Sequence, residues 1–421
     1  MKPYASYKPS GVAWLNADIP SQWISKRIKH VAAMQSGEGI TAETIDQSGT
    51  YPVYGGTGIR GFTAEKTHSG EFVLVGRQGA LCGNVHHVVG DFWASEHAVV
   101  SALYAGDNPR WAAYILEFMN LGQYSMAAAQ PGLAVDKIQQ LQLPVPPPDE
   151  QQAIADYLDT ETARIDTLVQ EKEELIGLLR EARSNRISEL ISGDGLPGSA
   201  TGNPWAPHLP EGWQLKRLKH LAQVRSGLAK GKDTGSNTTV ELPYLRVANV
   251  QEGRLDLREI STMPVEVDAV ERFSLLEGDV LMNEGGDYDK VGRGAVWTGE
   301  ISPCLHQNHV FAVRPVQRDL SEWISAITQT QYAKFYFMNN AKQSTNLASI
   351  SQASVKELPI LLPPKEQRDA LLEKLGGELA AFDALITHTQ EEIALLKELR
   401  AATIADAVLG RVDVRSLNQK Q

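Results

Sequence analysis

Histidines are the residues of this chain whose types and spacing come nearest to a metal-binding or catalytic pattern. His86 and His87 are adjacent, and His306 and His309 are three positions apart. A zinc site needs three or four ligands from His, Cys, Asp or Glu, and no cysteine or carboxylate at ligand spacing completes either pair. We therefore expect no metal site and interpret these histidines as strand residues or as contacts to a nucleic acid.

Other motifs that carry catalytic chemistry are missing from the sequence. Residues 227–232 (GLAKGK) lack the spacing and the hydroxyl residue of a phosphate-binding loop, and no G-x-S-x-G stretch marks a nucleophile. Asn203-Pro204-Trp205 is only faintly similar to the Asn-Pro-Pro-aromatic motif of adenine methyltransferases, because the second proline and a glycine-rich cofactor loop are both missing. The sequence therefore predicts a chain without catalytic residues.

The composition is that of an ordinary globular protein. Of 421 residues, 42% are hydrophobic and 22% charged, and this length predicts two to four domains. The two cysteines, Cys82 and Cys304, are too few for a disulfide framework. The sequence opens without a signal peptide, and no apolar run approaches the ~18 residues of a membrane span. We therefore expect a cytoplasmic protein with reduced cysteines.

The net charge of −11 argues at first against a nucleic-acid partner. The charge is uneven, however, because residues 146–195 hold twelve acidic and five basic residues. The large segments on either side of this stretch are close to neutral, and a near-neutral segment can still carry a basic face.

Two parts of the sequence are repeated. Residues 19–37 read IPSQWISKRIKHVAAMQSG and residues 209–227 read LPEGWQLKRLKHLAQVRSG, with nine identities at an offset of 190. Residues 143–159 (LPVPPPDEQQAIADYLD) and 358–375 (LPILLPPKEQRDALLEKL) form a second pair, which we align on Pro-Pro-x-Glu-Gln. Proline keeps the chain extended and lets a helix begin directly after it. Each segment therefore predicts a closing strand followed by a helix.

Both predicted helices are long and carry a heptad pattern of apolar residues. Each ends at a glycine, Gly193 or Gly410, as helices commonly do. Because each apolar seam needs a partner, we predict two helices of ~40 residues packed on one another as an antiparallel coiled coil. The predicted seam residues are Leu158, Ile165, Leu168, Leu175, Leu179 and Ala182 in the first helix, and Leu372, Leu375, Leu379, Phe382, Ile386, Thr389, Ile393 and Leu396 in the second.

The repeats predict an α+β protein with a pseudo-two-fold internal repeat and four parts. These parts are an α/β block over residues 1–145, a helix over 146–195, a second α/β block over 196–360 and a second helix over 361–421. We expect the first block to meet the helices only at residues 146–148.

Within the blocks, short β-branched runs bounded by glycine predict strands of a mixed or mostly antiparallel sheet. Residues 111–121 and 320–338 predict helices. The two blocks differ strongly in sequence between their shared opening and their closing strand.

The order and doubling of these motifs resemble the specificity subunit of a Type I restriction–modification enzyme over nearly the whole chain. The shared features are the opening SGVAWL…IPSQW, its echo LPEGWQLKRLKH, both Pro-Pro-x-Glu-Gln helix starts and both Leu-Leu-[Arg/Lys]-Glu tails. Residues 76–79 (GRQG) and 306–309 (HQNH) also resemble strands of such recognition domains. The resemblance implies that the two blocks are target-recognition domains of a non-catalytic subunit.

The resemblance also implies partners. The two domains would read a bipartite, asymmetric target in double-stranded DNA, and the chain would assemble two modification (methyltransferase) subunits with restriction (translocase and endonuclease) subunits. No cofactor is expected in this chain, because S-adenosylmethionine, ATP and magnesium would bind the partner subunits. The overall acidity favours an alternative, a coiled-coil scaffold that bridges protein partners without a DNA role. A third hypothesis is an enzyme that transfers methyl groups by itself.

Side-chain chemistry selects candidate DNA-binding residues. Arg, Lys, Asn and Gln can pair with base edges in the major groove, and cations, small polar groups and backbone N–H groups bind phosphates. In the first block the candidates are Gly55, Gly56, Thr57, Arg60, Arg77 and Gln78. In the second block they are Arg225, Lys230, Lys232, Ser236, Asn237, Arg246, Asn249, Asn283, Lys290, Arg293, Gln307 and Asn346.

A further set of basic residues is shared by both repeats and therefore cannot distinguish two half-sites. We assign this set to phosphate contact or to scaffold. It comprises Lys26, Arg27 and Lys29 with their counterparts Lys216, Arg217 and Lys219.

Overall fold

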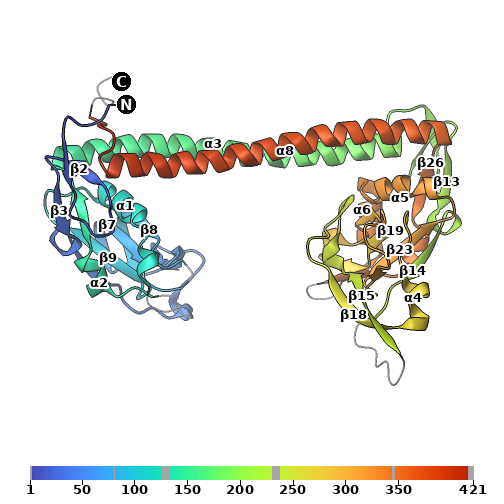
Figure 1. Ribbon diagram of the computed structural model, residues 1–421, viewed down its shortest axis with the longest axis horizontal. Helices are drawn as coiled ribbons and strands as arrows, with labels where there is room; N and C mark the ends of the chain where they lie inside the picture. The colour runs from blue at the N-terminus through green and yellow to red at the C-terminus, as the bar shows by residue number, and fades with distance from the viewer. Residues whose placement is uncertain (1, 80, 126–131, 230–237, 344–346, 416–421) are drawn as a thin grey trace. The chain divides into compact units, whose positions relative to one another are not determined.

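The computed structural model describes residues 2–79, 81–125, 132–229, 238–343 and 347–415. The chain divides into two compact units: unit 1 consists of Met1–Glu173 and Gln390–Gln421, and unit 2 of Glu174–Thr389. Each unit contains one block of strands and short helices together with parts of two long helices (Figure 1). The four-part division drawn from the sequence, which keeps each helix whole, stays a prediction.

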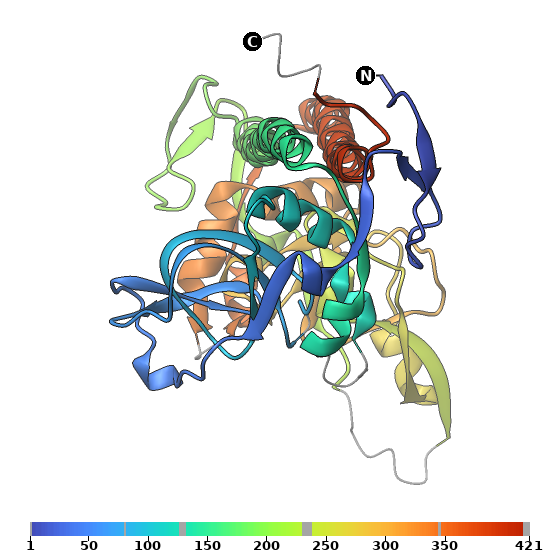
Figure 2. The same cartoon turned by 90° about the vertical axis from the view of Figure 1, so that its left-hand side faces the viewer.

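The two long helices are α3 (Pro148–Ser192, 45 residues) and α8 (Lys365–Val408, 44 residues). They lie side by side in both views of the chain (Figures 1 and 2). Acidic residues stand in the first turn of each, where the helix dipole favours negative charge. Among the described residues, no helix combines the length and the apolar character that a membrane span requires.

Unit 1 is built on a six-stranded sheet in which only β5 and β8 run parallel, so the predicted mixed, mostly antiparallel sheet is confirmed. Helices α1 (Pro109–Phe118) and α2 (Val135–Gln140) accompany the sheet. Two further strand pairs are β1 (Tyr7–Pro9) with β2 (Asp18–Pro20), and β3 (Ile24–Arg27) with β10 (Gln142–Val145). The sheet order is β4 (Ala32–Ser36), β9 (Ala98–Leu103), β7 (His68–Gly76), β8 (Val85–Ala94), β5 (Tyr51–Gly55) and β6 (Gly58–Thr63).

Unit 2 distributes its strands over smaller sheets. The main sheet has the order β14 (Ala222–Ser226), β23 (Val310–Pro315), β19 (Val280–Asn283) and β21 (Gly294–Val296). One three-stranded sheet has the order β18 (Ser261–Glu266), β15 (Thr239–Leu245) and β22 (Leu305–His306). A second has the order β20 (Gly285–Gly286), β25 (Ala348–Ile350) and β24 (Ala341–Gln343). The remaining pairs are β11 (Gly198–Ala200) with β12 (His208–Pro210), β13 (Gln214–Arg217) with β26 (Pro359–Leu362), and β16 (Val250–Gln251) with β17 (Arg254–Leu255).

Unit 2 also contains α4 (Val267–Phe273), α5 (Ser321–Thr328), α6 (Gln331–Asn340) and α7 (Gln352–Lys356). The single helix predicted over residues 320–338 is therefore wrong, because the segment forms two helices. Thr330 separates them: its backbone is extended, and its side chain accepts a hydrogen bond from the backbone N–H of Ala333 as the N-cap of α6.

Strand pairing fixes the register of the internal repeat. Arg27 of β3 pairs with Gln142 of β10, and its counterpart Arg217 of β13 pairs with Pro359 of β26. Gln142 and Pro359 are 217 positions apart, whereas the Pro-Pro-x-Glu-Gln alignment implies 216. The sequence alignment at the helix starts is thus wrong by one residue.

The corrected register explains how each helix start is held. Glu150 of α3 corresponds to Gln367 of α8, and each accepts a hydrogen bond from the repeated tryptophan. Trp23 Nε1 donates to Glu150 Oε2 (2.7 Å), and Trp213 Nε1 donates to Gln367 Oε1 (3.1 Å). The tryptophan of the repeated opening motif therefore anchors a helix in both units.

The same shift of 217 superimposes the two heptad seams. In α3 the seam runs through Leu158, Thr162, Ile165, Val169, Lys172, Ile176, Leu179, Arg183 and Ile187, none of which is exposed. The predicted seam of α8 is confirmed, but three predicted seam residues of α3 are wrong. Val169 takes the seam position in place of its neighbour Leu168, Leu175 is 40% exposed, and Ala182 is also exposed. Lys172 interrupts the apolar heptad pattern of α3, because this cation occupies a seam position and pairs with Glu392 (2.6 Å).

Two equivalent ion pairs show that the helices run antiparallel in each unit. In unit 1, Arg400 Nε bonds Asp166 Oδ1 at 2.9 Å. In unit 2, Arg183 Nε bonds Asp383 Oδ1 at 3.0 Å. The partners correspond by the shift of 217, as a pseudo-two-fold pair of helices requires.

The first block contacts the helices over a broad area, so the expected contact at residues 146–148 alone is wrong. Arg110 of α1 pairs with Asp156 of α3 (2.7 Å), and Arg400 of α8 pairs with Glu117 (3.0 Å). The apolar core of unit 1 is continuous from the block into both helices. It includes Trp23, Trp111, Ile154, Leu158 and Val408.

The first and last described residues of the chain lie together in unit 1 (Figure 1). The Asp413 N–H donates to the carbonyl of Lys2 (2.9 Å), and Tyr7 Oη donates to the carbonyl of Gly410 (3.0 Å). Gly410 has a φ of +66°, and a Cβ there would lie 2.4 Å from Pro20 Cγ. Gly193, at the end of α3, has the same conformation against Pro210 in unit 2. Both predicted helix-ending glycines therefore pack on the repeated Pro-x-x-Trp motif.

Glu150 provides a test of this anchoring. Its carboxylate, 5% exposed, accepts hydrogen bonds from Trp23 Nε1, Gln22 Nε2 (3.1 Å) and Arg415 Nη1 (3.2 Å). Glu150→Ala should lower the free energy of unfolding by about 3 kcal/mol, because it leaves the buried Trp23 N–H unpaired and removes two further hydrogen bonds. The matched variant Gln367→Ala, at an exposed residue with one such bond, should cost about 1 kcal/mol. Urea denaturation measures the free energy of unfolding of both variants. Equal losses would contradict the claim that Glu150 anchors its helix more strongly than Gln367 does.

Candidate nucleic-acid interface

Four segments of unit 1 converge beyond the end of β4. They are residues 36–38, 54–58, 76–78 and 94–98, and we call them junction 1. Backbone hydrogen bonds join them: Ser95 N to Tyr54 O, Glu38 N to Ala94 O, Ala98 N to Ser95 O, Arg77 N to His97 O, and Leu133 N to Arg77 O. The N–H···O distances lie between 2.8 and 2.9 Å.

Unit 2 contains the same arrangement, formed by residues 226–228, 245–246, 283–285 and 305–310, which we call junction 2. The corresponding bonds are Gln307 N to Leu245 O, Leu228 N to His306 O, Val310 N to Gln307 O, Glu284 N to His309 O, and Ile350 N to Glu284 O. The pseudo-two-fold repeat therefore extends into the blocks, although their sequences have diverged. His97 corresponds to His309, and Arg77 corresponds to Glu284.

A repeated glycine permits the close approach of chain segments in each junction. A Cβ at Gly37 would lie 2.3 Å from the carbonyl oxygen of Ala94, and one at Gly227 would lie 2.1 Å from that of His306. No side chain fits at such distances, which explains why the repeated opening motif ends in Ser-Gly in both copies.

Junction 1 carries Arg77 and several polar side chains together with two carboxylates, Glu38 and Glu96. Arg77 Nη1 donates to Ser36 Oγ (2.9 Å), and Gln78 Oε1 is bonded to His97 Nδ1 (2.9 Å). The hairpin turn between β5 and β6 lies beside them, since a Cβ at Gly56 would be 2.8 Å from the carbonyl oxygen of Gln78. Arg60 folds over this turn, with its Cδ 2.5 Å from a Cβ built at Gly55. Junction 1 thus contains five of the six residues predicted in the first block, including the exposed Thr57, and Arg60 lies directly beside it.

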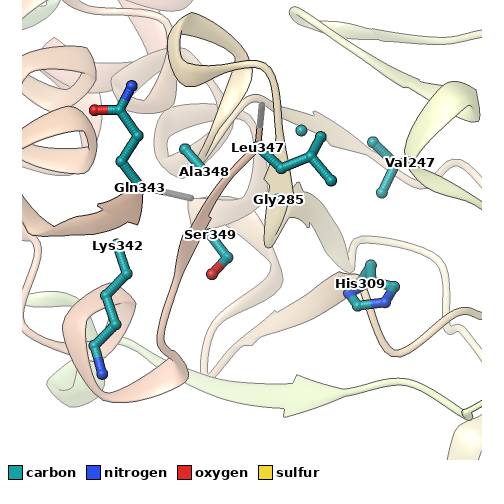
Figure 3. Close-up of a pocket in the computed structure, with 9 residues that line it drawn as sticks. Val247, Gly285, His309, Lys342, Gln343, Leu347, Ala348 and Ser349 are labelled. Atoms are coloured by element: carbon teal, nitrogen blue, oxygen red, sulfur yellow. The ribbon is translucent and has the colours of Figure 1, made fainter. Parts of the chain in front are cut away.

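Junction 2 presents different chemistry on the same backbone. His309 Nδ1 is bonded to Glu284 Oε2 at 2.6 Å, and Gly285 stands where junction 1 has Gln78. A pocket of about 500 Å³ opens beside this pair, lined by Val247, Gly285, Gly286, His309, Lys342, Gln343, Leu347, Ala348 and Ser349 (Figure 3).

The predicted residues of the second block are spread over several places. Gln307 and Arg246 both lie in junction 2, and Arg246 directly follows the last residue of β15. Arg225 of β14 donates to the carbonyl of Arg272, Arg293 Nη1 donates to Gln251 Oε1 (3.1 Å), and Lys290 pairs with Asp287. Lys230, Lys232, Ser236, Asn237 and Asn346 lie outside the described residues.

Two predicted asparagines are buried and hold the backbone. Asn249 is 3% exposed; its Nδ2 donates to the carbonyls of Asp256 (2.8 Å) and Glu259 (2.9 Å), and its Oδ1 accepts from the N–H of Arg246 (2.8 Å). Asn283 is 2% exposed, and its Nδ2 donates to the carbonyl of Val250 (3.1 Å). Neither amide is available to a ligand in this structure, so we omit both from the proposed interface.

Four of the shared basic residues lie on the strands that pair with the closing strands, and Lys29 and Lys219 lie in the 3-10 helices directly after them. In unit 2, Arg217 and Lys219 both contact the carboxylate of Glu357, at 2.8 and 2.6 Å. The hydrogen bond from Lys219 is the main cause that lowers the pKa of Glu357. In unit 1, Arg27 Nη1 donates to Gln140 Oε1 at 3.3 Å. These contacts favour the scaffold role of the set.

Of the histidines noted in the sequence, His86 and His306 have pKa values lowered by burial, and His87 and His309 each pair with a glutamate. Burial lowers the pKa of His306 to about 4 and also lowers that of His86, so both rings are neutral at pH 7. His306 Nδ1 bonds the carbonyl of Val310 (2.7 Å), and His87 pairs with Glu71 (2.8 Å). Across the part of the chain that the structure describes, no three His, Cys, Asp or Glu side chains are grouped to hold a metal ion.

Sequence reasoning missed Glu284 and His97, and it named His309 only as a strand residue or a contact to a nucleic acid. A carboxylate is not an expected nucleic-acid contact, and His97 has no sequence counterpart that could be aligned. Their positions became evident only from the strand register, which shows that each belongs to a repeated junction.

The fold and its twin junctions define a protein with two related modules, each built on parts of the same two long helices. The family model for the Type I restriction modification DNA specificity domain matches residues 20–176 and 210–398. The match covers more than half of the chain, which therefore belongs to this family. Each matched stretch contains one block and most of the helix that follows it.

Individual relatives agree with this assignment. The Type I restriction enzyme EcoprrI specificity subunit of Escherichia coli is 43% identical over 171 residues, which are 40% of this chain and 41% of that protein. The EcoKI specificity subunit of Escherichia coli strain K12 is 24% identical over 282 residues, 65% of this chain and 58% of that protein. The alignments therefore span between two fifths and three fifths of these relatives.

Solved structures share the fold. A chain from the structure titled "Structural basis underlying complex assembly and conformational transition of the type I R-M system" has a TM-score of 0.64 at 16% identity, and the match covers 94% of this chain and all of that one. The HsdS subunit from Thermoanaerobacter tengcongensis has a TM-score of 0.50 at 16% identity, over 94% of this chain and 99% of that one.

Proposed function

We propose that this chain is the non-catalytic, sequence-reading subunit of a Type I restriction–modification complex, and that each unit reads one half of a bipartite, asymmetric DNA target. The observation that carries the proposal is the pair of junctions. Their backbones share five equivalent hydrogen bonds while their side chains differ in charge and size. A common backbone with different side chains suits two modules that read unrelated half-sites on one kind of ligand.

The chemistry of junction 1 supports DNA as this ligand. Arg and Gln side chains supply the donors and acceptors that base edges require, and a glycine-rich hairpin lets backbone N–H groups approach phosphates. Arg77, Gln78 and the 55–58 turn lie side by side in this unit. The expected partners are two modification subunits, which would bind S-adenosylmethionine, and restriction subunits, which would bind ATP and magnesium. The chain itself would hold no cofactor.

The experiment measures binding of the assembled chain and modification subunits to fluorescent duplex DNA. Methylation mapping in cells that carry the complete system first supplies the target sequence. The proposal predicts that affinity for this target exceeds that for a scrambled duplex roughly 10³-fold or more and falls steeply with salt, because phosphate contacts release counterions. Equal, weak binding to both duplexes by an assembled complex would instead support the scaffold without a DNA role.

A further inference from the structure

Arg77 and Glu284 occupy the same place in the two junctions and carry opposite charges. The N–H of Arg77 donates to the carbonyl of His97, and its carbonyl accepts from Leu133. The N–H of Glu284 donates to the carbonyl of His309, and its carbonyl accepts from Ile350. Both side chains therefore leave equivalent points of the backbone. Arg77 is half-buried, and the side chain of Glu284 is 27% exposed.

The next residue makes a second difference. Gln78 fills junction 1 with an amide that is bonded to His97 (2.9 Å), whereas Gly285 leaves its place in junction 2 without a side chain. The pocket of about 500 Å³ lies at this point. Figure 3 shows His309 and Val247 on one side of it and Lys342 and Gln343 on the other. In this arrangement His309 is bonded to Glu284 instead (2.6 Å).

We propose that Glu284, His309 and the adjoining pocket form the base-reading site of unit 2, and that this site selects an exocyclic amino group, that of cytosine before that of adenine. The equivalent Arg77 selects the two acceptors of guanine. This inference rests on the proposed function, in which the junctions read DNA.

The preference follows from hydrogen-bonding capacity. An ionised carboxylate only accepts hydrogen bonds, so it requires a donor on the base. In the major groove the donors are the amino groups of cytosine and adenine, while guanine presents two acceptors that repel a carboxylate. Adenine also places an acceptor beside its amino group, which makes cytosine the better partner of Glu284. Arg77 carries several donors and no acceptor, so its best match is guanine.

A carboxylate close to phosphates weakens binding to every sequence, and it is therefore suited to discrimination more than to affinity. Specificity is a difference between affinities, and repulsion of the wrong base contributes to it as much as attraction of the right one. His309 limits the cost because its Nδ1 is bonded to Glu284 Oε2 (2.6 Å). The apolar wall formed by Val247, Leu347 and Ala348 offers van der Waals contact to the rest of the base.

Two variants of the full chain test the proposal. Glu284→Gln keeps the size of the side chain and adds donors, and Glu284→Arg with Gly285→Gln copies the Arg-Gln pair of junction 1. Gly285 has no positive φ, but its built Cβ lies 3.1 Å from the carbonyl oxygen of Ala348, so a side chain there requires a small backbone shift. Glu277→Gln, at an exposed carboxylate of the same unit that pairs with Arg318, is the matched control.

The measurement is the affinity of each assembled complex for duplexes in which every position of the wild-type target is varied in turn. Glu284→Gln should reduce discrimination roughly 10- to 100-fold at one cytosine or adenine of one half-site, and leave the other half-site unchanged. The double variant should prefer guanine at that position, and the control should match the wild type.

Unchanged discrimination, or equal weakening on all sequences by the Gln variant, would overturn the assignment of Glu284. Absence of any sequence preference in the wild-type complex would instead overturn the proposed function. Circular dichroism of the variants establishes that they are folded.

Discussion

Replacing residues 1–145 with the corresponding segment of another specificity subunit should exchange one half of the DNA target and leave the other half intact. Junction 1 lies entirely within this segment and junction 2 entirely outside it. Affinity for the original target should fall roughly 10³-fold or more, since one half-site is then read as non-specific DNA. Methylation mapping in cells that carry the complete system reads both halves at once, and a change in both would contradict the modular account.

The structure adds a condition to this experiment. Arg110 and Glu117 of the first block pair with Asp156 of α3 and Arg400 of α8. A chimera that lacks Arg110 leaves Asp156 without its cation, and one that lacks Glu117 leaves Arg400 paired with Asp166 alone. Such a chimera loses stability for reasons unrelated to DNA reading. The informative chimera therefore retains both residues, and a second one that lacks them shows the size of the stability effect.

Ile176→Asp should destabilise unit 2 severely, whereas the neighbouring Leu175→Asp should be nearly neutral. Ile176 is 6% exposed in the seam between α3 and α8, and Leu175 is 40% exposed. A carboxylate in the apolar seam loses its hydration without a partner, which should cost about 4 kcal/mol, against roughly 0.5 kcal/mol or less at the surface position. Thermal denaturation of the two variants measures these losses of stability. Equal losses, or a larger loss for Leu175→Asp, would contradict a seam that runs through Ile176.

The helices were predictable from the sequence because their pattern is local. The seam of α8 repeats in steps of three and four without interruption, and it is confirmed. In α3 the pattern breaks at Lys172, where a cation takes a seam position and pairs with Glu392. An apolar pattern cannot identify such a position, so Leu175 was assigned in place of Ile176.

The second junction could not be found from the sequence because the two blocks differ in the lengths of their loops. Ser36 and Ser226 are 190 positions apart, Arg77 and Glu284 are 207 apart, and His97 and His309 are 212 apart. An alignment that follows the opening motif therefore loses the register before it reaches the junction. Strand pairing restores it, because hydrogen bonds to β9 and β23 define which residues are equivalent.

The residues predicted in the first block lie together in the structure, whereas those predicted in the second block do not. Gly55, Gly56, Arg77 and Gln78 stand at the ends of glycine-bounded strands, and strand ends of one sheet edge meet in space. Residue type alone was a poor guide for Asn249 and Asn283. Their amides hydrogen-bond to buried backbone carbonyls, a role that is common for asparagine and invisible in a sequence.

The most direct test of the central claim, that each junction contacts its own half of one DNA target, is site-specific photo-crosslinking. A photoreactive phenylalanine analogue replaces Thr57 in junction 1 or Asn308 in junction 2, with exposed Glu211 as the control position. The complex assembled with modification subunits is irradiated on the target duplex, and the crosslinked bases are identified. The account predicts that position 57 marks one half-site, position 308 marks the other, and position 211 marks neither. Crosslinks from 57 and 308 to protein partners alone, or to the same half-site, would contradict it.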